Sequence, residues 1–153
     1  MTYADCKQAE LDVLGELANK HGYDLTLTDD SCVVDGILAR DGQVYVIEIK
    51  TRPSMSGNLS SWFDQETGQT YDEALFDEHK IDDVKRKARA LGGTPIVAQY
   101  LPAVGRLYTW DLDAVNPTST RSVKSQASME GGTKQISRQF YAINEAKIGD
   151  INL

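Results

Sequence analysis

The segment from Val33 to Arg52, VVDGILARDGQVYVIEIKTR, constrains the fold more than any other part of the sequence. It contains two apolar runs separated by Asp41-Gly42, the dipeptide that most favours a two-residue type I′ hairpin turn. With that turn, Arg40 pairs with Gln43, and the residue numbers of every opposed pair add up to 83. We therefore predict a β-hairpin whose register is set by its turn.

The same register brings three charged side chains together at the end of the hairpin away from the turn. Asp35 falls opposite Glu48, and opposed residues share a face of the sheet with Cβ atoms roughly 4.5–5.5 Å apart. Lys50 points the same way as Glu48, because side chains alternate along a strand. Two carboxylates about 5 Å apart repel by roughly 3 kcal/mol at an effective dielectric near 20, so the pair needs a neighbouring cation.

Two interpretations of this charge cluster are open. Lys50 could balance the carboxylates in a structural ion pair at the strand end. Alternatively, a divalent cation could bind between the carboxylate oxygens, which are hard ligands of the kind that Mg²⁺ and Mn²⁺ prefer. We favour the metal site, because strands that are apolar on both faces rarely carry three charged side chains for structural reasons.

Length and composition narrow the classes of protein to consider. A chain of 153 residues can form one domain with a substantial core, and we expect a single domain over residues 1–153. No apolar run approaches the roughly 18 residues of a transmembrane helix, and the N-terminus lacks a signal-peptide pattern. The two cysteines and two histidines are too few for a disulfide framework or a histidine-rich metal site. We therefore expect an intracellular, cytoplasmic protein with reduced thiols.

The net charge of −7 argues against a nucleic-acid partner, but the charges are unevenly distributed. Residues 1–83 contain 6 Lys and Arg against 18 Asp and Glu, whereas residues 84–153 contain 10 against 5. Such an asymmetry permits a basic face or arm on an acidic body. The overall charge therefore weakens a DNA-binding interpretation without excluding it.

Local patterns predict the order helix, strand, strand, strand, helix, strand. Helices are expected between a capping pattern at Thr2 and a stop at Gly22, and again from about Asp77 to Leu91. Strands are expected over residues 23–27, 32–39, 43–51, 95–101 and 106–112. Residues 53–76 contain many Ser, Gly, Asn and Thr residues, and we predict a long loop there. This loop either packs over the charged site or contacts substrate, or it is a surface loop anchored by its aromatic side chains.

A second hairpin is expected over residues 121–143, with its turn around Glu130-Gly131-Gly132. This segment is polar and carries basic residues, including Lys134 and Arg138. An exposed basic ribbon suits contact with a DNA backbone or exchange between subunits, although a plain edge hairpin explains the pattern equally well.

Val34-Asp35 followed by Glu48-Ile49-Lys50 resembles the signature of the PD-(D/E)xK, or restriction-endonuclease-like, nuclease superfamily. Val34 stands where the signature has proline. The resemblance covers roughly residues 4–101. It implies an α/β fold with a central mixed β-sheet flanked by helices, in the order αβββαβ. We expect this core over about 4–112 and a C-terminal β-hairpin extension over about 116–153, as in a phage-type or Holliday-junction-resolvase-like member.

The resemblance also implies roles for the charged residues. Asp35 and Glu48 would bind Mg²⁺, or Mn²⁺, together with the backbone carbonyl of Ile49. Lys50 would position or activate the attacking water and balance negative charge in the transition state. The metal would supply Lewis acidity and a more nucleophilic water.

Members of the superfamily often add a glutamate from the first helix to this set. Glu10 is the candidate for that position and Glu16 is the reserve. Phosphate contacts with DNA are expected from four basic residues: Lys80, Lys85, Lys134 and Arg138.

The function expected from these observations is Mg²⁺-dependent hydrolysis of DNA phosphodiester bonds. The chain is short and lacks a separate recognition domain, so we expect a structure-selective or end-processing enzyme rather than a sequence-specific one. A homodimer could assemble the basic channel that an acidic chain needs. Two alternatives are a catalytically silent binding protein with a nuclease fold, which binds DNA or inhibits a defence complex, and a nuclease whose substrate is RNA.

Overall fold

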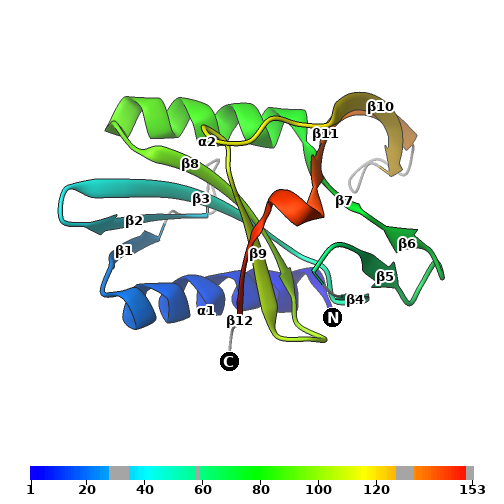
Figure 1. The fold of residues 1–153 in the computed structure, drawn as a ribbon, viewed down its shortest axis with the longest axis horizontal. Coiled ribbons are helices and arrows are strands. Elements are labelled where there is room, and N and C mark those ends of the chain that lie inside the picture. The colour runs from blue at the N-terminus through cyan, green and yellow to red at the C-terminus, as the bar shows by residue number, and fades with distance from the viewer. Residues whose placement is uncertain (28–34, 58, 127–132, 151–153) are drawn as a thin grey trace.

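The computed structural model describes residues 1–27, 35–57, 59–126 and 133–150. Its centre is a six-stranded sheet in the order β1-β2-β3-β8-β9-β12 (Figure 1). Within this sheet β3 and β8 are parallel, and the other described pairs are antiparallel. The sheet is therefore mixed, as predicted. Its strands are β1 (Asp24–Leu27), β2 (Gly36–Arg40), β3 (Gln43–Thr51), β8 (Thr94–Leu101), β9 (Arg106–Asp111) and β12 (Lys147–Asp150).

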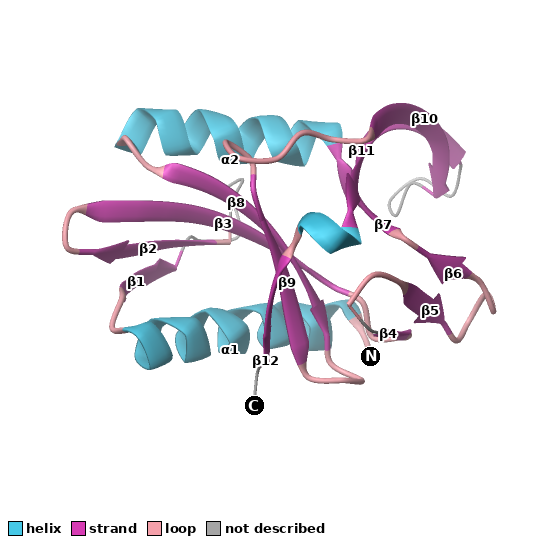
Figure 2. Ribbon diagram, in the orientation of Figure 1, coloured by secondary structure: helices cyan, strands magenta, loops and turns pink. Residues whose placement is uncertain are grey.

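Two helices cover opposite faces of this sheet. Figure 2 shows α1 (Tyr3–His21) below the sheet and α2 (Glu78–Leu91) above it, with the N-terminal ends of both helices on the same side of the view. The helix boundaries agree with the prediction. α1 begins with a capping box between Thr2 and Asp5, and both helices end at a glycine in the left-handed conformation.

The core is divided into two hydrophobic clusters by the sheet. Val46 of β3 is buried in the cluster that contains the apolar face of α2, whereas Ile47 and Ile49 are buried in the cluster that contains the apolar face of α1. Because side chains alternate along a strand, Glu48 and Lys50 lie on the α2 side of β3. The packing of β3 thus fixes the direction of both charged residues.

The register of the hairpin between β2 and β3 is the predicted one. Arg40 pairs with Gln43 and Gly36 pairs with Ile47. Asp41 and Gly42 both have positive φ angles, 52° and 80°, as a type I′ turn requires. Regular pairing ends at Gly36, and residues 32–34 of the predicted strand lie outside the described residues.

The prediction of a long loop over residues 53–76 is wrong. This segment contains β4 (Met55–Gly57), β5 (Trp62–Asp64) and β6 (Thr70–Tyr71), which form a small antiparallel sheet, and most of β7 (Glu73–Asp77). Strands of two or three residues are too short to show a periodic pattern. Their anchor is Trp62, which is 1% exposed and packs edge-on against the rings of Tyr108 and Trp110.

The C-terminal hairpin is confirmed, but it is more embedded in the fold than an edge ribbon. β10 (Ser119–Gln126) pairs with β11 (Thr133–Ala142), and β11 also pairs with β7 to form a three-stranded sheet. The predicted turn around Glu130-Gly131-Gly132 lies outside the described residues. After the short helix η1 (Ile143–Glu145), the chain returns to the main sheet as β12, which the sequence patterns did not predict.

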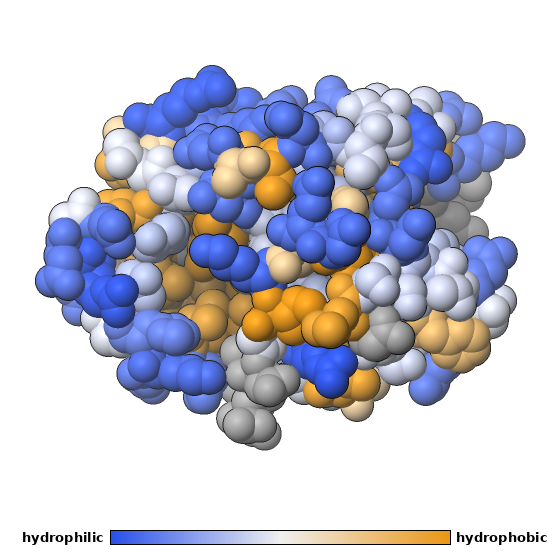
Figure 3. Space-filling model, in the orientation of Figure 1, coloured by the Kyte–Doolittle hydropathy of each residue, from blue (hydrophilic) through white to orange (hydrophobic). Residues whose placement is uncertain are grey.

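The surface reflects this layering. In Figure 3 the side of α2 is largely hydrophilic, and hydrophobic residues gather in the band between the two helices, where the sheet reaches the surface. Within the described ranges, no helix combines the length and the apolar character that a membrane span requires.

Candidate active site

A cavity of about 270 Å³ lies at the end of the β2–β3 hairpin away from the turn. Its walls come from both helices and from β3, so residues far apart in the sequence meet there. It is lined by Tyr3, Lys7 and Glu10 of α1, by Asp35, by Glu48, Ile49 and Lys50 of β3, and by Lys80 of α2. The predicted residues Asp35, Glu48, Lys50 and Glu10 therefore face one space.

Asp35 is held in place by both of its side-chain oxygens. The backbone N–H of Ile49 donates to Oδ2 at 2.6 Å, and the Lys7 ammonium lies 3.0 Å from Oδ1. The backbone N–H of Asp35 also donates to the carbonyl of Ile47 at 3.0 Å. The side chain is 6% exposed. The carboxylate thus continues the hydrogen bonding of the hairpin beyond the last regular pair.

Glu48 faces α2 and lies 3.7 Å from the ammonium of Lys80. Its side chain is 15% exposed. Burial raises the pKa of Glu48 to about 7, and the negative charge of Asp35 contributes to this shift. Glu48 and Asp35 therefore repel each other, as the hairpin register predicted.

Glu10 is the helix carboxylate that reaches the cavity. Its Oε1 accepts a hydrogen bond from the hydroxyl of Thr51 at 3.4 Å. Burial raises the pKa of Glu10 to about 7, and the charge of Asp35 again adds to the effect. Glu16, the reserve candidate, is not among the residues that line this space.

Lys50 lines the same cavity from β3. The surrounding protein displaces water from its ammonium, which lowers the pKa of Lys50, and the positive charge of Arg52 lowers it further. A lysine with a depressed pKa can exchange a proton more readily near neutral pH.

Lys7 was missed by the sequence analysis. Burial alone would lower the pKa of Lys7, but the hydrogen bond and charge of Asp35, together with the charges of Glu10 and Glu48, raise it overall. Lys7 lies three residues before Glu10 on α1, which places the two side chains on one helix face. That spacing is the signal that could have identified it.

The cavity contains carboxylate oxygens, the kind of ligand that a hard divalent cation prefers. Glu10, Asp35 and Glu48 supply carboxylate oxygens, and burial together with the negative charge of Asp35 raises the pKa of Glu10 and of Glu48. Among the described residues, no three His, Cys, Asp or Glu side chains are grouped closely enough to hold a metal ion as they stand. Lys7 and Lys80 instead contact the oxygens of Asp35 and Glu48. These two ammonium groups supply positive charge where a cation would supply it.

Of the four predicted phosphate contacts, Lys80 and Arg138 line one small cavity together, whereas Lys85 does not. Lys80 also lines the larger cavity, whereas Lys85 lines a separate one near the C-terminal end of α2. Arg138 and Lys50 both line the small cavity. The backbone of Lys134 belongs to β11, but its side chain lies outside the described part of the structure.

The fold is similar to that of a known Holliday junction resolvase. That protein is Hjc from the archaeal hyperthermophile Archaeoglobus fulgidus, and its fold is restriction-endonuclease-like. The TM-score is 0.55 at 16% sequence identity, over 87% of this chain and 82% of the resolvase chain. The chain has the restriction-endonuclease-like fold. In this fold the central sheet carries Glu48 and Lys50 on β3, the strand that faces both helices.

A further comparison found the bacterial homing endonuclease I-Ssp6803I, with a TM-score of 0.46 and 12% identity over 74% of this chain and 72% of that chain. No protein-family model and no curated protein sequence matches the chain.

Proposed function

We propose that this protein is a divalent-metal-dependent nuclease that hydrolyses phosphodiester bonds in DNA. The observation that carries the proposal is the meeting of Asp35, Glu48 and Lys50 around one cavity. The shared fold with a Holliday junction resolvase supports the same class of reaction. The supporting cation is Mg²⁺ or Mn²⁺, for which carboxylates are suitable ligands.

In this proposal Asp35 and Glu48 would hold the cation with the carbonyl of Ile49, and Glu10 would complete the set from α1. When bound, such an ion supplies Lewis acidity and lowers the pKa of water. Asp35 is suited to a fixed position, because the Ile49 N–H holds one of its oxygens at 2.6 Å. Lys7 and Lys80 would then be released to contact phosphate oxygens.

Lys50 acts on the water and on the reacting phosphate. Its side chain lines the cavity together with the carboxylates, so it can accept a proton from the attacking water or donate a hydrogen bond to a phosphate oxygen. Its lowered pKa favours the first role, because less free energy is needed to remove its proton.

We further propose that the enzyme is structure-selective or end-processing. In the described residues, the helices and strands belong to the main sheet, to the two helices that cover it and to the two small sheets beside it. Direct reading of bases needs side chains that reach the base edges in a groove.

The test is a cleavage assay with pure protein on linear, plasmid, branched and single-stranded DNA and on RNA. We expect cleavage of at least one DNA substrate with Mg²⁺ or Mn²⁺, loss of cleavage with EDTA, and a loss of roughly 100-fold or more in Lys50→Ala. Lys20→Ala, at the exposed C-terminal end of α1, is the matched control and should cleave like the wild type. Failure to cleave any substrate in the panel would refute the enzymatic proposal.

A catalytically silent binding protein is the second candidate. The observation in its favour is that Asp35 and Glu48 already have lysine partners in the folded chain. It predicts that calorimetry detects no binding of Mn²⁺ and that DNA binds without being cut. Calorimetric Mn²⁺ binding that is lost in Asp35→Asn would exclude it.

A further inference from the structure

A second, smaller cavity of about 100 Å³ opens beside the first one. Glu48, Lys50 and Lys80 line both cavities, so the two are neighbours along the α2 side of β3. The remaining walls of the small cavity are Arg52, Leu75, Phe76, Asp77 and Arg138.

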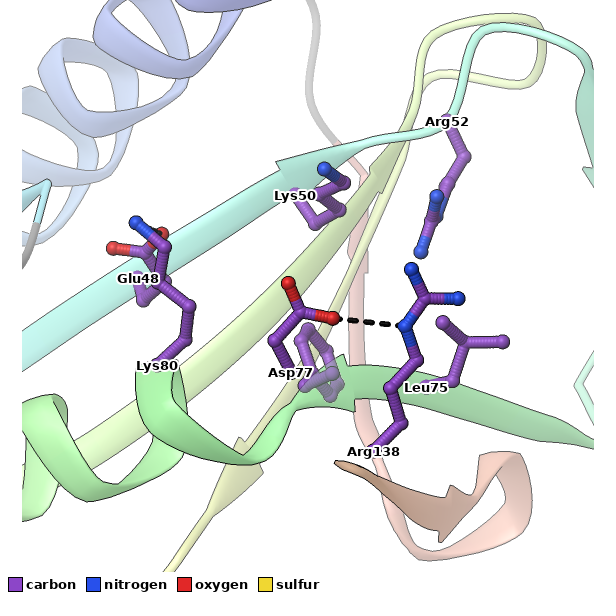
Figure 4. A pocket seen from close by; sticks show the side chains of 8 residues that line it. Glu48, Lys50, Arg52, Leu75, Asp77, Lys80 and Arg138 are labelled. Carbon is purple, nitrogen blue, oxygen red and sulfur yellow. Dashed lines mark hydrogen bonds and ion pairs between the residues drawn. The ribbon is translucent and has the colours of Figure 1, made fainter. Parts of the chain in front are cut away.

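Two arginines from different sheets face each other across this cavity. Arg52 lies one residue beyond β3, and its backbone N–H donates to the carbonyl of Tyr100 at 2.9 Å, so the strand geometry continues to Arg52 and directs its side chain to the side of Lys50. Arg138 comes from β11, and its Nε lies 2.8 Å from Oδ1 of Asp77. Figure 4 shows the guanidinium groups of Arg52 and Arg138 pointing toward one another, with Asp77 beside Arg138.

Arg52 has a side-chain donor that is not used in the described structure. Its Nε is fully buried and has no hydrogen-bond partner among the described atoms. Burial lowers the pKa of Arg52, and the positive charge of Arg138 lowers it further, while Asp77 and Asp64 oppose these effects. Arginine nevertheless stays protonated at physiological pH. The fold therefore retains a half-buried cation with an unused donor beside a second cation, an arrangement that destabilises the free protein.

The charge balance of the cavity points to an anionic ligand. Four cationic side chains line it, Lys50, Arg52, Lys80 and Arg138, against the two carboxylates of Glu48 and Asp77. Both carboxylates already contact cations, Glu48 with Lys80 and Asp77 with Arg138. A planar guanidinium presents a fork of N–H donors that matches the oxygens of a phosphate.

We propose that Arg52 and Arg138 form a binding site for a second phosphate group, next to the phosphate that reacts at Lys50. That the phosphate belongs to DNA rests on the proposed nuclease function, whereas the anion site itself does not. The phosphate is either a diester within the bound strand or a monoester at a strand end. Asp77 positions Arg138, and the ligand accepts hydrogen bonds from the terminal guanidinium nitrogens of Arg52, which point toward Arg138.

The first experiment tests the anion site without requiring catalysis. Binding of inorganic phosphate to the metal-free protein is measured by calorimetry in EDTA. We expect saturable binding by the wild type that weakens about tenfold or more in Arg52→Gln and in Arg138→Gln, because each removes charged hydrogen bonds. Arg52→Lys keeps the charge but loses the fork, and it should also bind more weakly.

Arg121→Gln is the matched control. Arg121 lies opposite Arg138 on the same pair of strands, is 52% exposed and pairs with Glu73 at 3.0 Å. Its phosphate affinity should equal that of the wild type. Circular dichroism establishes whether each variant is folded. If Arg52→Gln does not fold, the phosphate affinities of Arg138→Gln and Arg52→Lys test the proposal. Absence of phosphate binding by the wild type, or equal binding by folded variants of both arginines, would overturn the proposal.

The second experiment identifies the source of the phosphate. Duplexes with 5′-phosphate, 3′-phosphate or hydroxyl ends are bound in Ca²⁺ at several salt concentrations. A terminal site predicts a preference for one phosphorylated end that Arg52→Gln removes. An internal site predicts equal affinity for all ends and a salt slope that is smaller by about one in Arg52→Gln.

If DNA binding is identical in Arg52→Gln and Arg121→Gln, the site does not serve DNA. Phosphate binding without DNA binding or cleavage would retain the anion site and refute the proposed function.

Discussion

Glu10 and Glu48 are ionisable groups held where ionisation is unfavourable. Burial and the charge of Asp35 raise the pKa of both side chains to about 7. A carboxylate with a raised pKa in the folded state destabilises the fold once it is ionised. These residues therefore lower the stability of the metal-free protein near neutral pH, which is a common property of residues kept for function.

The substitution Glu48→Gln should stabilise the metal-free protein. Glutamine has nearly the shape of a protonated glutamate, and it removes the charge that burial and Asp35 disfavour. We expect the free energy of unfolding at pH 8 in EDTA to rise by about 1–3 kcal/mol, after allowance for the lost contact with Lys80. Urea denaturation followed by circular dichroism measures this difference.

The gain in the free energy of unfolding from Glu48→Gln should depend on pH, because the pKa of Glu48 is higher in the folded chain than in the unfolded chain. Below the ordinary pKa of 4.5, Glu48 is protonated in both folded and unfolded chains and has no effect. As the pH rises from 4.5 to about 7, the unfolded chain ionises first, so the folded wild type loses stability. The advantage of Glu48→Gln should therefore be smallest below pH 4.5 and full above pH 7. Glu66→Gln, at an exposed position, is the control. An advantage that is independent of pH would contradict this account.

At the scale of single elements, the hairpin of β2 and β3 has the residues that set its register at one end and the candidate site residues at the other. The turn at Asp41-Gly42 sets the register, and the charged residues lie at the opposite end. Between them β3 runs as an apolar strand that packs against both helices. A change in the turn should therefore act on stability and leave the geometry of the charged end intact once the chain has folded.

Two glycine substitutions test this separation. Gly42 has a φ of 80°, so Gly42→Ala should destabilise the fold by about 1–2 kcal/mol, because a Cβ is strained in that conformation. Gly15 lies inside α1, and a Cβ there would meet no atom within 4 Å. Gly15→Ala should stabilise the fold by about 0.5–1 kcal/mol.

Thermal unfolding measures both changes, and cleavage per folded molecule should equal that of the wild type in each variant. Equal stability of the two variants would show that the left-handed conformation at Gly42 is not needed. A cleavage defect in folded Gly42→Ala would show that the turn influences the distant charged end.

In the second hairpin, the position of Arg138 depends on the pairing of β11 with β7. From its sequence alone, β11 is a polar strand of the kind expected in a plain hairpin at the edge of a sheet. In the structure, β7 pairs with it and places Arg138 opposite Asp77. The direct bond between these two side chains directs Arg138 to the cavity beside Lys50. This pairing joins residues 61 positions apart, so no local pattern could indicate it.

At the scale of the whole molecule, the predictable part of the fold is the part encoded locally. The register of the hairpin follows from two turn residues, and the helices follow from caps and apolar spacing, and all of these are confirmed. The short strands β4 to β6 and the return of β12 to the main sheet were missed. They depend on contacts with distant segments, such as the packing of Trp62 against Trp110.

The residues of the candidate site also divide into those that the sequence could predict and those that it could not. Asp35, Glu48 and Lys50 could be predicted together because one hairpin carries all three. Lys7 and Arg52 were missed because their partners, Asp35 and Arg138, come from other elements. Alternation along β3 and the helical spacing to Glu10 show which way these side chains point, but they do not show what the side chains meet.

Divalent cations should stabilise the whole molecule through Asp35. Because the chain carries a net charge of −7, weak binding of cations over the surface is expected in any case, and a specific site must be separated from it. At Mn²⁺ concentrations 100 times the dissociation constant, binding to the folded state adds about 2.7 kcal/mol, or about 5–10 °C in Tm for a chain of this size. Differential scanning calorimetry should show this rise in the wild type and only the small surface effect in Asp35→Asn. Asp113→Asn, which removes an exposed carboxylate elsewhere, should behave like the wild type. An equal rise in all three proteins would mean that Mn²⁺ stabilises the chain through its overall charge and that Asp35 binds no metal.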